Sequence, residues 1–209
     1  MQVSLYQPHD LLWVKDIVIH QENPNWYANH IITRPVVVRR AKDHPLIPVG
    51  VRGSQKTQRL ACWVNRQDII KSISAIEVVK RQLWLSQYAQ HPLQQFKVLQ
   101  KIELIFSQLN LSWGLCGSLG FELATGLMVA NENSDIDLIV YMADKPQNEK
   151  LVLLWQMLQK LPFKADLQIE TPIGAIALYE WMNKPEKIMV KTNLGPILCT
   201  DPWSAITKV

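Results

Sequence analysis

The chain has 209 residues, of which 48% are hydrophobic and 19% charged, and its formal net charge is +4. This composition is typical of a globular protein with one large domain or two small ones, and it excludes a disordered chain. No apolar run is long enough to cross a bilayer, and residues 1–10 lack the basic and apolar regions of a signal peptide. The three cysteines are far apart, which suits a reducing compartment, so we expect a cytoplasmic protein without membrane contact.

The positive charge is concentrated in the first part of the chain. Residues 1–89 contain 12 Lys and Arg against 6 Asp and Glu, whereas residues 90–209 contain 10 against 12. Every arginine lies before residue 90, and the guanidinium group is well shaped to bind phosphate through two hydrogen bonds. One interpretation is therefore a phosphate-binding region that includes Arg52 and Arg59, together with Arg39 and Arg40. The alternatives are a solvated basic surface and a docking surface for an acidic protein. Nucleic acid is disfavoured, because the chain is only mildly basic and has no recognised binding motif.

Residues 1–90 contain several short strand patterns. Runs of β-branched residues predict strands at 35–38, 47–51 and 60–64, and the residues between the last two form a polar, basic connector. Residues 1–29 are mixed in character and rich in turns. We therefore expect a small β-rich domain over residues 1–90 that binds the substrate or a carrier protein.

Residues 91–209 alternate between helix and strand patterns. Apolar residues recur at spacings of three and four over 96–109 and 151–161, which predicts two amphipathic helices. Strands are predicted at 111–116, 136–142 and 163–170, and a short helix at 121–125. These patterns fit an α/β or an α+β domain. We expect an α+β protein whose C-terminal domain has a mixed sheet packed by helices.

The predicted strand at 136–142 opens with an acidic pair. Strand side chains alternate between faces, so Asp135 and Asp137 project to one side while Ile136 and Leu138 point to the core. Two neighbouring carboxylates repel each other unless a cation lies between them, and hard oxygen ligands of this kind suit Mg²⁺. Gly117-Ser118 precedes the pair. A glycine there lets the backbone approach a phosphate closely, and a following helix would point its N–H groups at the anion.

A later strand offers a third acid. Asp166, Gln168 and Glu170 share one face of the strand predicted at 163–170, so either Asp166 or Glu170 could join the acidic pair, and we favour Asp166. Three carboxylates could hold two Mg²⁺ ions. One ion would lower the pKa of an attacking hydroxyl, and the other would hold the leaving phosphates.

Each of these patterns is common on its own, because solvated acidic pairs and Gly-Ser turns occur in many proteins. Their order is more specific: a strand, Gly-Ser, a short helix, Asp-x-Asp at the start of an apolar strand, and then an acidic strand. This order resembles the polymerase-beta nucleotidyltransferase superfamily. The resemblance implies that Asp135 and Asp137 bind metal.

Strings outside that region resemble a more specific family, the malonate decarboxylase holo-acyl-carrier-protein synthases, which are phosphoribosyl-dephospho-CoA transferases. They are PHDLLW at 8–13, RPVVVRRA at 34–41, PVGVRG at 48–53, QR at 58–59, ETP at 170–172, GA at 174–175, EW at 180–181, KT at 191–192, GP at 195–196 and DPW at 201–203. The similarity spans nearly the whole chain. Lys56 and Thr57 depart from it, since we would expect more arginine there.

The resemblance implies a defined reaction. The donor would be 2′-(5″-triphosphoribosyl)-3′-dephospho-CoA, the acceptor a serine of the apo acyl-carrier subunit of malonate decarboxylase, and the by-product pyrophosphate. Asp135, Asp137 and Asp166 would form the Mg²⁺ site and help the serine to attack, while Gly117 and Ser118 would hold the leaving phosphates. The alternatives are an ATP-dependent nucleotidyltransferase that acts on another protein or a small molecule, and a non-catalytic module of the same fold.

Overall fold

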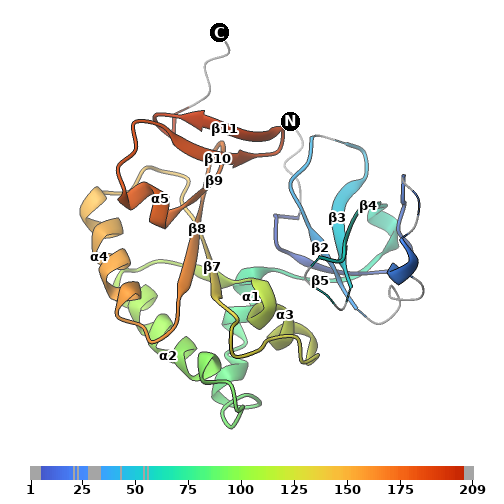
Figure 1. The fold of residues 1–209 in the computed structure, drawn as a ribbon, viewed down its shortest axis with the longest axis horizontal. Helices are drawn as coiled ribbons and strands as arrows, with labels where there is room; N and C mark the ends of the chain where they lie inside the picture. The colour runs from blue at the N-terminus through green and yellow to red at the C-terminus, as the bar shows by residue number, and fades with distance from the viewer. Residues whose placement is uncertain are drawn as a thin grey trace. The chain divides into compact units, whose positions relative to one another are not determined.

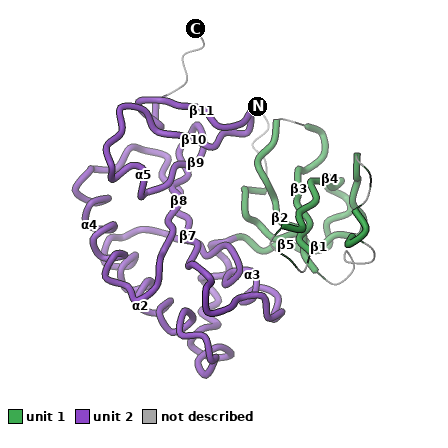
Figure 2. The backbone as a smooth tube through the Cα atoms, in the orientation of Figure 1, with its two compact units in different colours: residues 1–74 green, residues 75–209 purple. Residues whose placement is uncertain are grey.

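The structure, a computed structural model, describes residues 6–20, 22, 24–27, 34–42, 44–53, 55 and 57–204. The chain forms two compact units, Met1–Ser74 and Ala75–Val209, which Figure 2 colours separately. The first is rich in strands and the second combines a mixed sheet with helices, so the predicted α+β class is confirmed.

The first unit contains a five-stranded antiparallel sheet in the order β4-β3-β2-β1-β5. Its elements are β1 (Leu11–Val14), η1 (Asn25–Tyr27), β2 (Val36–Val38), β3 (Ile47–Arg52), β4 (Arg59–Val64), η2 (Arg66–Asp68) and β5 (Ile69–Ile73). Buried residues alternate with exposed ones along β4, where Leu60, Cys62 and Val64 point into a core that Leu12 and Val49 also enter. Each fully buried aliphatic side chain of this kind contributes roughly 1.5–3 kcal/mol.

The second unit contains a six-stranded mixed sheet in the order β11-β10-β9-β8-β7-β6 (Figure 1). Its elements are α1 (Ala75–Lys80), η3 (Leu83–Leu85), α2 (Gln94–Gln108), β6 (Trp113–Leu115), α3 (Gly117–Thr125), β7 (Ile136–Tyr141), α4 (Asn148–Gln159), β8 (Ala165–Thr171), β9 (Gly174–Ala177), α5 (Leu178–Met182), β10 (Ile188–Thr192) and β11 (Gly195–Cys199). β7 and β8 run parallel and are joined through α4, while the other neighbouring strands run antiparallel.

The two faces of this sheet carry different side chains. Ile136, Leu138 and Val140 point to one face and are buried. α2 packs on the same side, since its Phe106 stacks on Trp113, which is paired with Val140. Asp137 belongs to the opposite face by strand alternation. On that face α1 and α3 cover the β6 end of the sheet through a small apolar cluster of Ala75, Cys116 and Ile139.

The border between the units differs from the predicted one near residue 90. Residues 75–90 belong to the second unit because they pack on its sheet. A side chain at Gly114 of β6 would meet Ala75 of α1, and Trp84 of η3 lies 6.2 Å from Trp113 between ring centroids. These contacts connect residues far apart in the sequence, so the local pattern does not reveal them.

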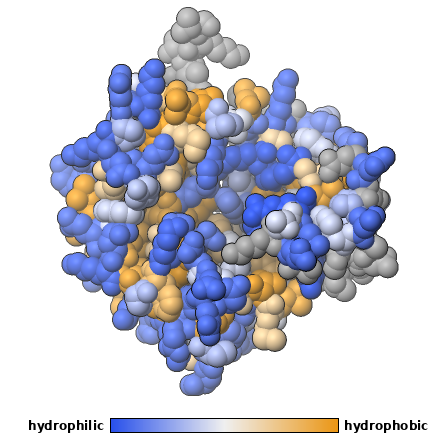
Figure 3. Space-filling view, viewed as in Figure 1, coloured by the Kyte–Doolittle hydropathy of each residue, from blue (hydrophilic) through white to orange (hydrophobic). Residues whose placement is uncertain are grey.

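The face of the molecule in Figure 3 carries many hydrophilic residues, with apolar residues between them. The β10–β11 hairpin contributes three of them, Met189, Leu194 and Leu198. Within the described part of the chain, no helix has both the length and the apolar character that crossing a membrane requires.

Candidate active site

The parallel pairing of β7 with β8 brings two predicted acids side by side. Asp137 is directly opposite Asp166 in the register, so both side chains point to the same face of the sheet. Asp135 immediately precedes β7 and is linked to the same group by Lys164. The Lys164 Nζ lies 2.6 Å from Asp166 Oδ2 and 3.3 Å from Asp135 Oδ2. The structure thus gathers Asp135, Asp137 and Asp166 at one end of β7 and β8.

Lys164 is the cation that two of these carboxylates share. Its hydrogen bond to Asp166 raises its pKa, and the attraction of Asp166 and the contact with Asp135 act in the same direction. The side chains of Lys164, Asp135 and Asp166 are 66%, 48% and 46% exposed, so a ligand from solvent can reach all three. Among the described residues, no three His, Cys, Asp or Glu side chains already converge as a metal site. The ammonium of Lys164 shows that a positive charge fits between Asp135 and Asp166.

Glu170, the other candidate for the third acid, lies apart from this group. It is buried, and its Oε1 accepts a hydrogen bond of 2.8 Å from Gln168 Nε2. Its neighbour in β7 is Tyr141, four residues beyond Asp137, which is about 13 Å along a strand. The geometry therefore groups Asp166, rather than Glu170, with Asp135 and Asp137.

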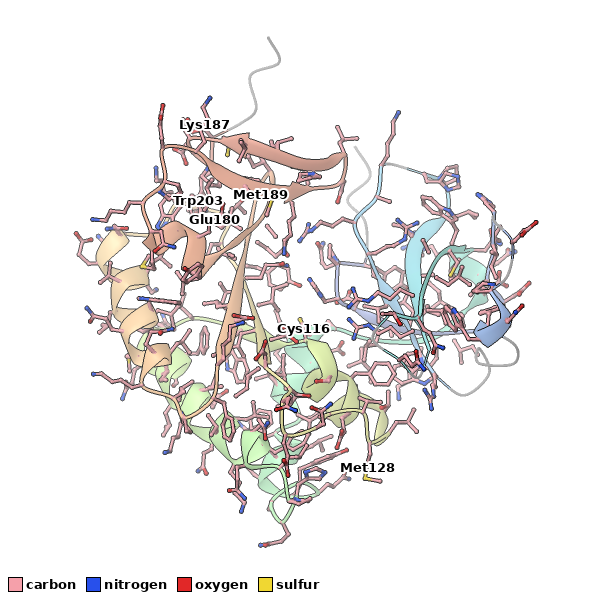
Figure 4. The ribbon with its side chains drawn as sticks, in the orientation of Figure 1. Cys116, Met128, Glu180, Lys187, Met189 and Trp203 are labelled. Carbon is pink, nitrogen blue, oxygen red and sulfur yellow. The ribbon has the colours of Figure 1, made fainter. Side chains whose placement is uncertain are left out.

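Gly117 and Ser118 begin α3 directly beside Asp137. Gly117 has a left-handed φ of 63°, and a Cβ placed there would collide with the Asp137 carboxylate. The backbone N–H of Cys116, which Figure 4 labels just before α3, donates a 2.8 Å hydrogen bond to the Asp137 carbonyl. The free N–H groups at a helix N-terminus attract anions. The N-terminus of α3 thus lies next to Asp137, and a phosphate bound there would lie close to Asp135, Asp137 and Asp166.

The four predicted arginines lie in the first unit and form two pairs. Arg52 and Arg59 are exposed and stand opposite each other at the end of the β3–β4 ladder. Arg39 lies near the other end of β3, where its Nε donates to the Val49 carbonyl at 3.1 Å and its guanidinium lies 5.0 Å from the centre of the Trp63 ring. Arg40 follows it in the chain. Their contact with phosphate stays a prediction, and Lys56 lies outside the described residues.

Comparison with known protein families assigns both parts of the chain. Residues 82–202 match the model of the phosphoribosyl-dephospho-CoA transferase MdcG C-terminal domain, and residues 7–75 match that of the N-terminal domain. The chain belongs to the phosphoribosyl-dephospho-CoA transferase family. The resemblance identified in the sequence is therefore confirmed, and so is the prediction that the chain is a transferase.

Relatives named phosphoribosyl-dephospho-CoA transferase are similar over nearly their whole length. One from Azotobacter vinelandii is 35% identical over 206 residues, which cover 97% of this chain and 96% of the relative. One from Klebsiella pneumoniae is 36% identical over 206 residues, with 94% and 96% covered. One from Pseudomonas putida is 33% identical over 202 residues, with 95% and 96% covered. No solved structure matches the chain.

Three residues that the structure connects to this candidate site were not predicted from the sequence. Lys164 lies two positions before Asp166, a spacing that puts both on one strand face and could have revealed it. Glu122 stands among apolar residues of α3, and Gln95 lies on the buried face of α2. Their partners lie in the loop before β7, which no local pattern indicates.

Proposed function

We propose that this chain transfers 2′-(5″-phosphoribosyl)-3′-dephospho-CoA from its triphosphoribosyl precursor to a serine of the apo acyl-carrier subunit of malonate decarboxylase, with release of pyrophosphate. The observation that carries the proposal is the juxtaposition of Asp137 with Asp166 and Gly117, in a chain whose two halves match this transferase family. Carboxylates that can hold a metal ion, beside a helix N-terminus that attracts phosphate, suit the transfer of a phosphate-linked group.

Mg²⁺ is the cofactor that we propose for this site. Asp135, Asp137 and Asp166 would hold it, and their oxygens are the hard ligands that Mg²⁺ prefers. When bound, it would supply positive charge to the reacting phosphate and to the attacking hydroxyl. The contact of Lys164 with Asp135 and Asp166 supports this assignment, because a cation already lies between these two carboxylates.

The residues of the chain then have distinct roles in the proposed step. The serine oxygen attacks the phosphorus next to the ribose, and its proton passes to the Asp166 carboxylate. A new phosphodiester bond forms as the bond to the second phosphate breaks. Pyrophosphate leaves toward the start of α3, where backbone N–H groups and the Ser118 hydroxyl can donate hydrogen bonds to it. Holding the two substrates in line provides much of the acceleration in such reactions.

The experiment is intact-mass spectrometry of the apo acyl-carrier subunit of malonate decarboxylase. The carrier is incubated with this protein, Mg²⁺ and the triphosphoribosyl donor, and parallel reactions contain EDTA or replace the donor by ATP. We expect a mass gain equal to phosphoribosyl-dephospho-CoA with the donor, and no gain with EDTA. Absence of the gain, or adenylylation with ATP instead, would contradict the proposed substrates.

A further inference from the structure

Buried polar side chains hold the loop that leads to Asp135 and Asp137. Residues 127–134 join α3 to β7 without regular secondary structure, and Asp135 follows immediately. Most of the loop is exposed, including Met128 at 87%, which Figure 4 labels on the outer side of α3. An exposed loop of this kind is mobile unless buried groups hold its backbone.

Glu122 of α3 is the first of these buried groups. Its side chain is only 1% exposed, and its Oε2 accepts hydrogen bonds of 2.9 Å from the backbone N–H groups of both Val129 and Ala130. A buried carboxylate is costly unless hydrogen bonds or opposite charges compensate for the loss of water. The two hydrogen bonds from the loop backbone therefore compensate for much of the free energy lost when the Glu122 carboxylate is buried.

The second oxygen of Glu122 faces His91. The His91 Nε2 lies 3.2 Å from Glu122 Oε1, in ion-pair range although not aligned as a hydrogen bond. His91 Nδ1 accepts the Leu93 N–H, so the neutral ring carries its proton on Nε2, the atom that faces the carboxylate. The Tyr88 hydroxyl donates to the Glu122 carbonyl at 3.0 Å. Glu122 is thus held through its backbone carbonyl as well as through both carboxylate oxygens.

Gln95 of α2 is the second buried group. It is 2% exposed, and its Nε2 donates to the carbonyls of Asn131 at 3.3 Å and Glu132 at 2.9 Å. Glu122 binds the N–H groups of residues 129 and 130, so the two side chains together hold four consecutive residues of the loop. The Asn131 carbonyl also accepts the Ser134 N–H, which closes a turn directly before Asp135.

We infer that Glu122 and Gln95 are positioning residues that hold residues 127–134, and thereby Asp135 and Asp137, in place against the start of α3. α3 carries Gly117 against Asp137 at one end and Glu122 against the loop about 7.5 Å further along its axis. α3 thus positions both the backbone N–H groups that we propose bind phosphate and the carboxylates that we propose bind the metal. The inference rests on the proposed function for the role of the acids.

The test uses Glu122→Gln and Gln95→Leu in the full chain. In Glu122→Gln, one carboxylate oxygen is replaced by an NH2 group, which can only donate hydrogen bonds. This group must face either the N–H groups of the loop or the N–H of His91, and in both cases two donors face each other. In Gln95→Leu both donors to the loop are lost. The matched control is Gln100→Leu, which makes the same change at an exposed position of α2.

Two measurements are independent of the transfer reaction. Hydrogen exchange followed by mass spectrometry should show faster exchange in the peptide that covers 127–134 in both variants, with the β8 peptide unchanged. Titration with Mn²⁺ should show affinity about tenfold weaker in both variants and unchanged in the control, a typical loss when a group that orients metal ligands is removed. The kcat for transfer should fall by a similar factor, with the KM for the donor unchanged.

The outcomes separate this inference from the proposed function. Faster loop exchange with unchanged Mn²⁺ affinity, or unchanged exchange in both variants, would overturn the positioning role. Absence of Mn²⁺ binding by the unmodified protein would overturn it as well. If Mn²⁺ binds and weakens as expected but the carrier gains no mass, the proposed substrates are wrong while the positioning role stands.

Discussion

At the scale of single residues, Gly117 lies where a side chain and the Asp137 carboxylate cannot coexist. We expect Gly117→Ala to lose most transfer activity for two reasons. The left-handed φ of 63° costs an L-residue about 1–2 kcal/mol, and the added methyl group displaces the Asp137 side chain. The measurements are the transfer rate and the melting temperature.

The chain offers a matched control for the backbone cost. Gly126 also has a left-handed φ, of 76°, but a Cβ placed there meets no atom within 4 Å. Gly126→Ala should therefore lose a similar amount of stability and keep its activity. Equal activity of the two variants would show that the contact between Gly117 and Asp137 has no catalytic importance.

Lys164 occupies the position where we propose that a divalent cation binds. Because both compete for the Asp135 and Asp166 oxygens, Lys164→Met should bind Mn²⁺ more tightly. An exposed ion pair contributes up to about 1 kcal/mol, so the gain should be at most about fivefold by calorimetric titration. The exposed Lys160→Met serves as the control. Weaker Mn²⁺ binding by Lys164→Met would mean that the ammonium assists the metal instead.

The same ion pair has a defined pH dependence. Because its carboxylate partners raise the pKa of Lys164, its stabilising contribution is complete below the ordinary lysine pKa. It is lost as the pH rises through the higher pKa of the folded protein. The difference in melting temperature between the unmodified chain and Lys164→Met should therefore be constant between about pH 6 and 9 and shrink only at higher pH.

At the scale of elements, the sequence predicted the strands with clear local patterns. β2, β3, β4, β6, β7 and β8 all overlap the predicted ranges, and so do the two long helices α2 and α4. β1 and β5 were missed, as were β9, β10 and β11, because they lie in stretches with mixed composition. α3 begins at Gly117, earlier than the predicted start at 121, because close packing against Leu115 and Asp137 outweighs the low helix propensity of glycine.

The register of β7 and β8 explains why the third acid could not be chosen from the sequence. Asp166, Gln168 and Glu170 are equivalent under strand alternation, since all three share one face. Only the pairing of Asp137 with Asp166 distinguishes them, and that pairing depends on how α4 returns the chain to the sheet. The anchoring of the loop by Glu122 and Gln95 likewise depends on contacts over 7 to 37 residues.

At the scale of the whole molecule, the four arginines predicted to bind phosphate belong to the first unit and the three acids to the second. If Arg52 and Arg59 bind the donor, Arg52→Gln combined with Arg59→Gln should raise the KM for the donor by at least about tenfold. That factor corresponds to the loss of one charge-assisted hydrogen bond. The measurement is the transfer rate at varied donor and varied carrier concentrations.

The control for the loss of positive charge alone is Arg66→Gln, at an exposed position of η2. A rise in the KM for the carrier, steepest at low salt and without a change for the donor, would favour the docking interpretation instead.

If Asp135, Asp137 and Asp166 together perform the transfer, removal of one of these carboxylates must slow it. The rate of mass gain of the carrier is compared between the unmodified protein and Asp137→Asn, with Asp144→Asn as a control at an exposed acid outside the group. We expect a loss of at least about a hundredfold for Asp137→Asn, a typical effect of removing one electrostatic group from a transition state, and a normal rate for the control. A folded Asp137→Asn protein with a near-normal rate would contradict this role of the three carboxylates.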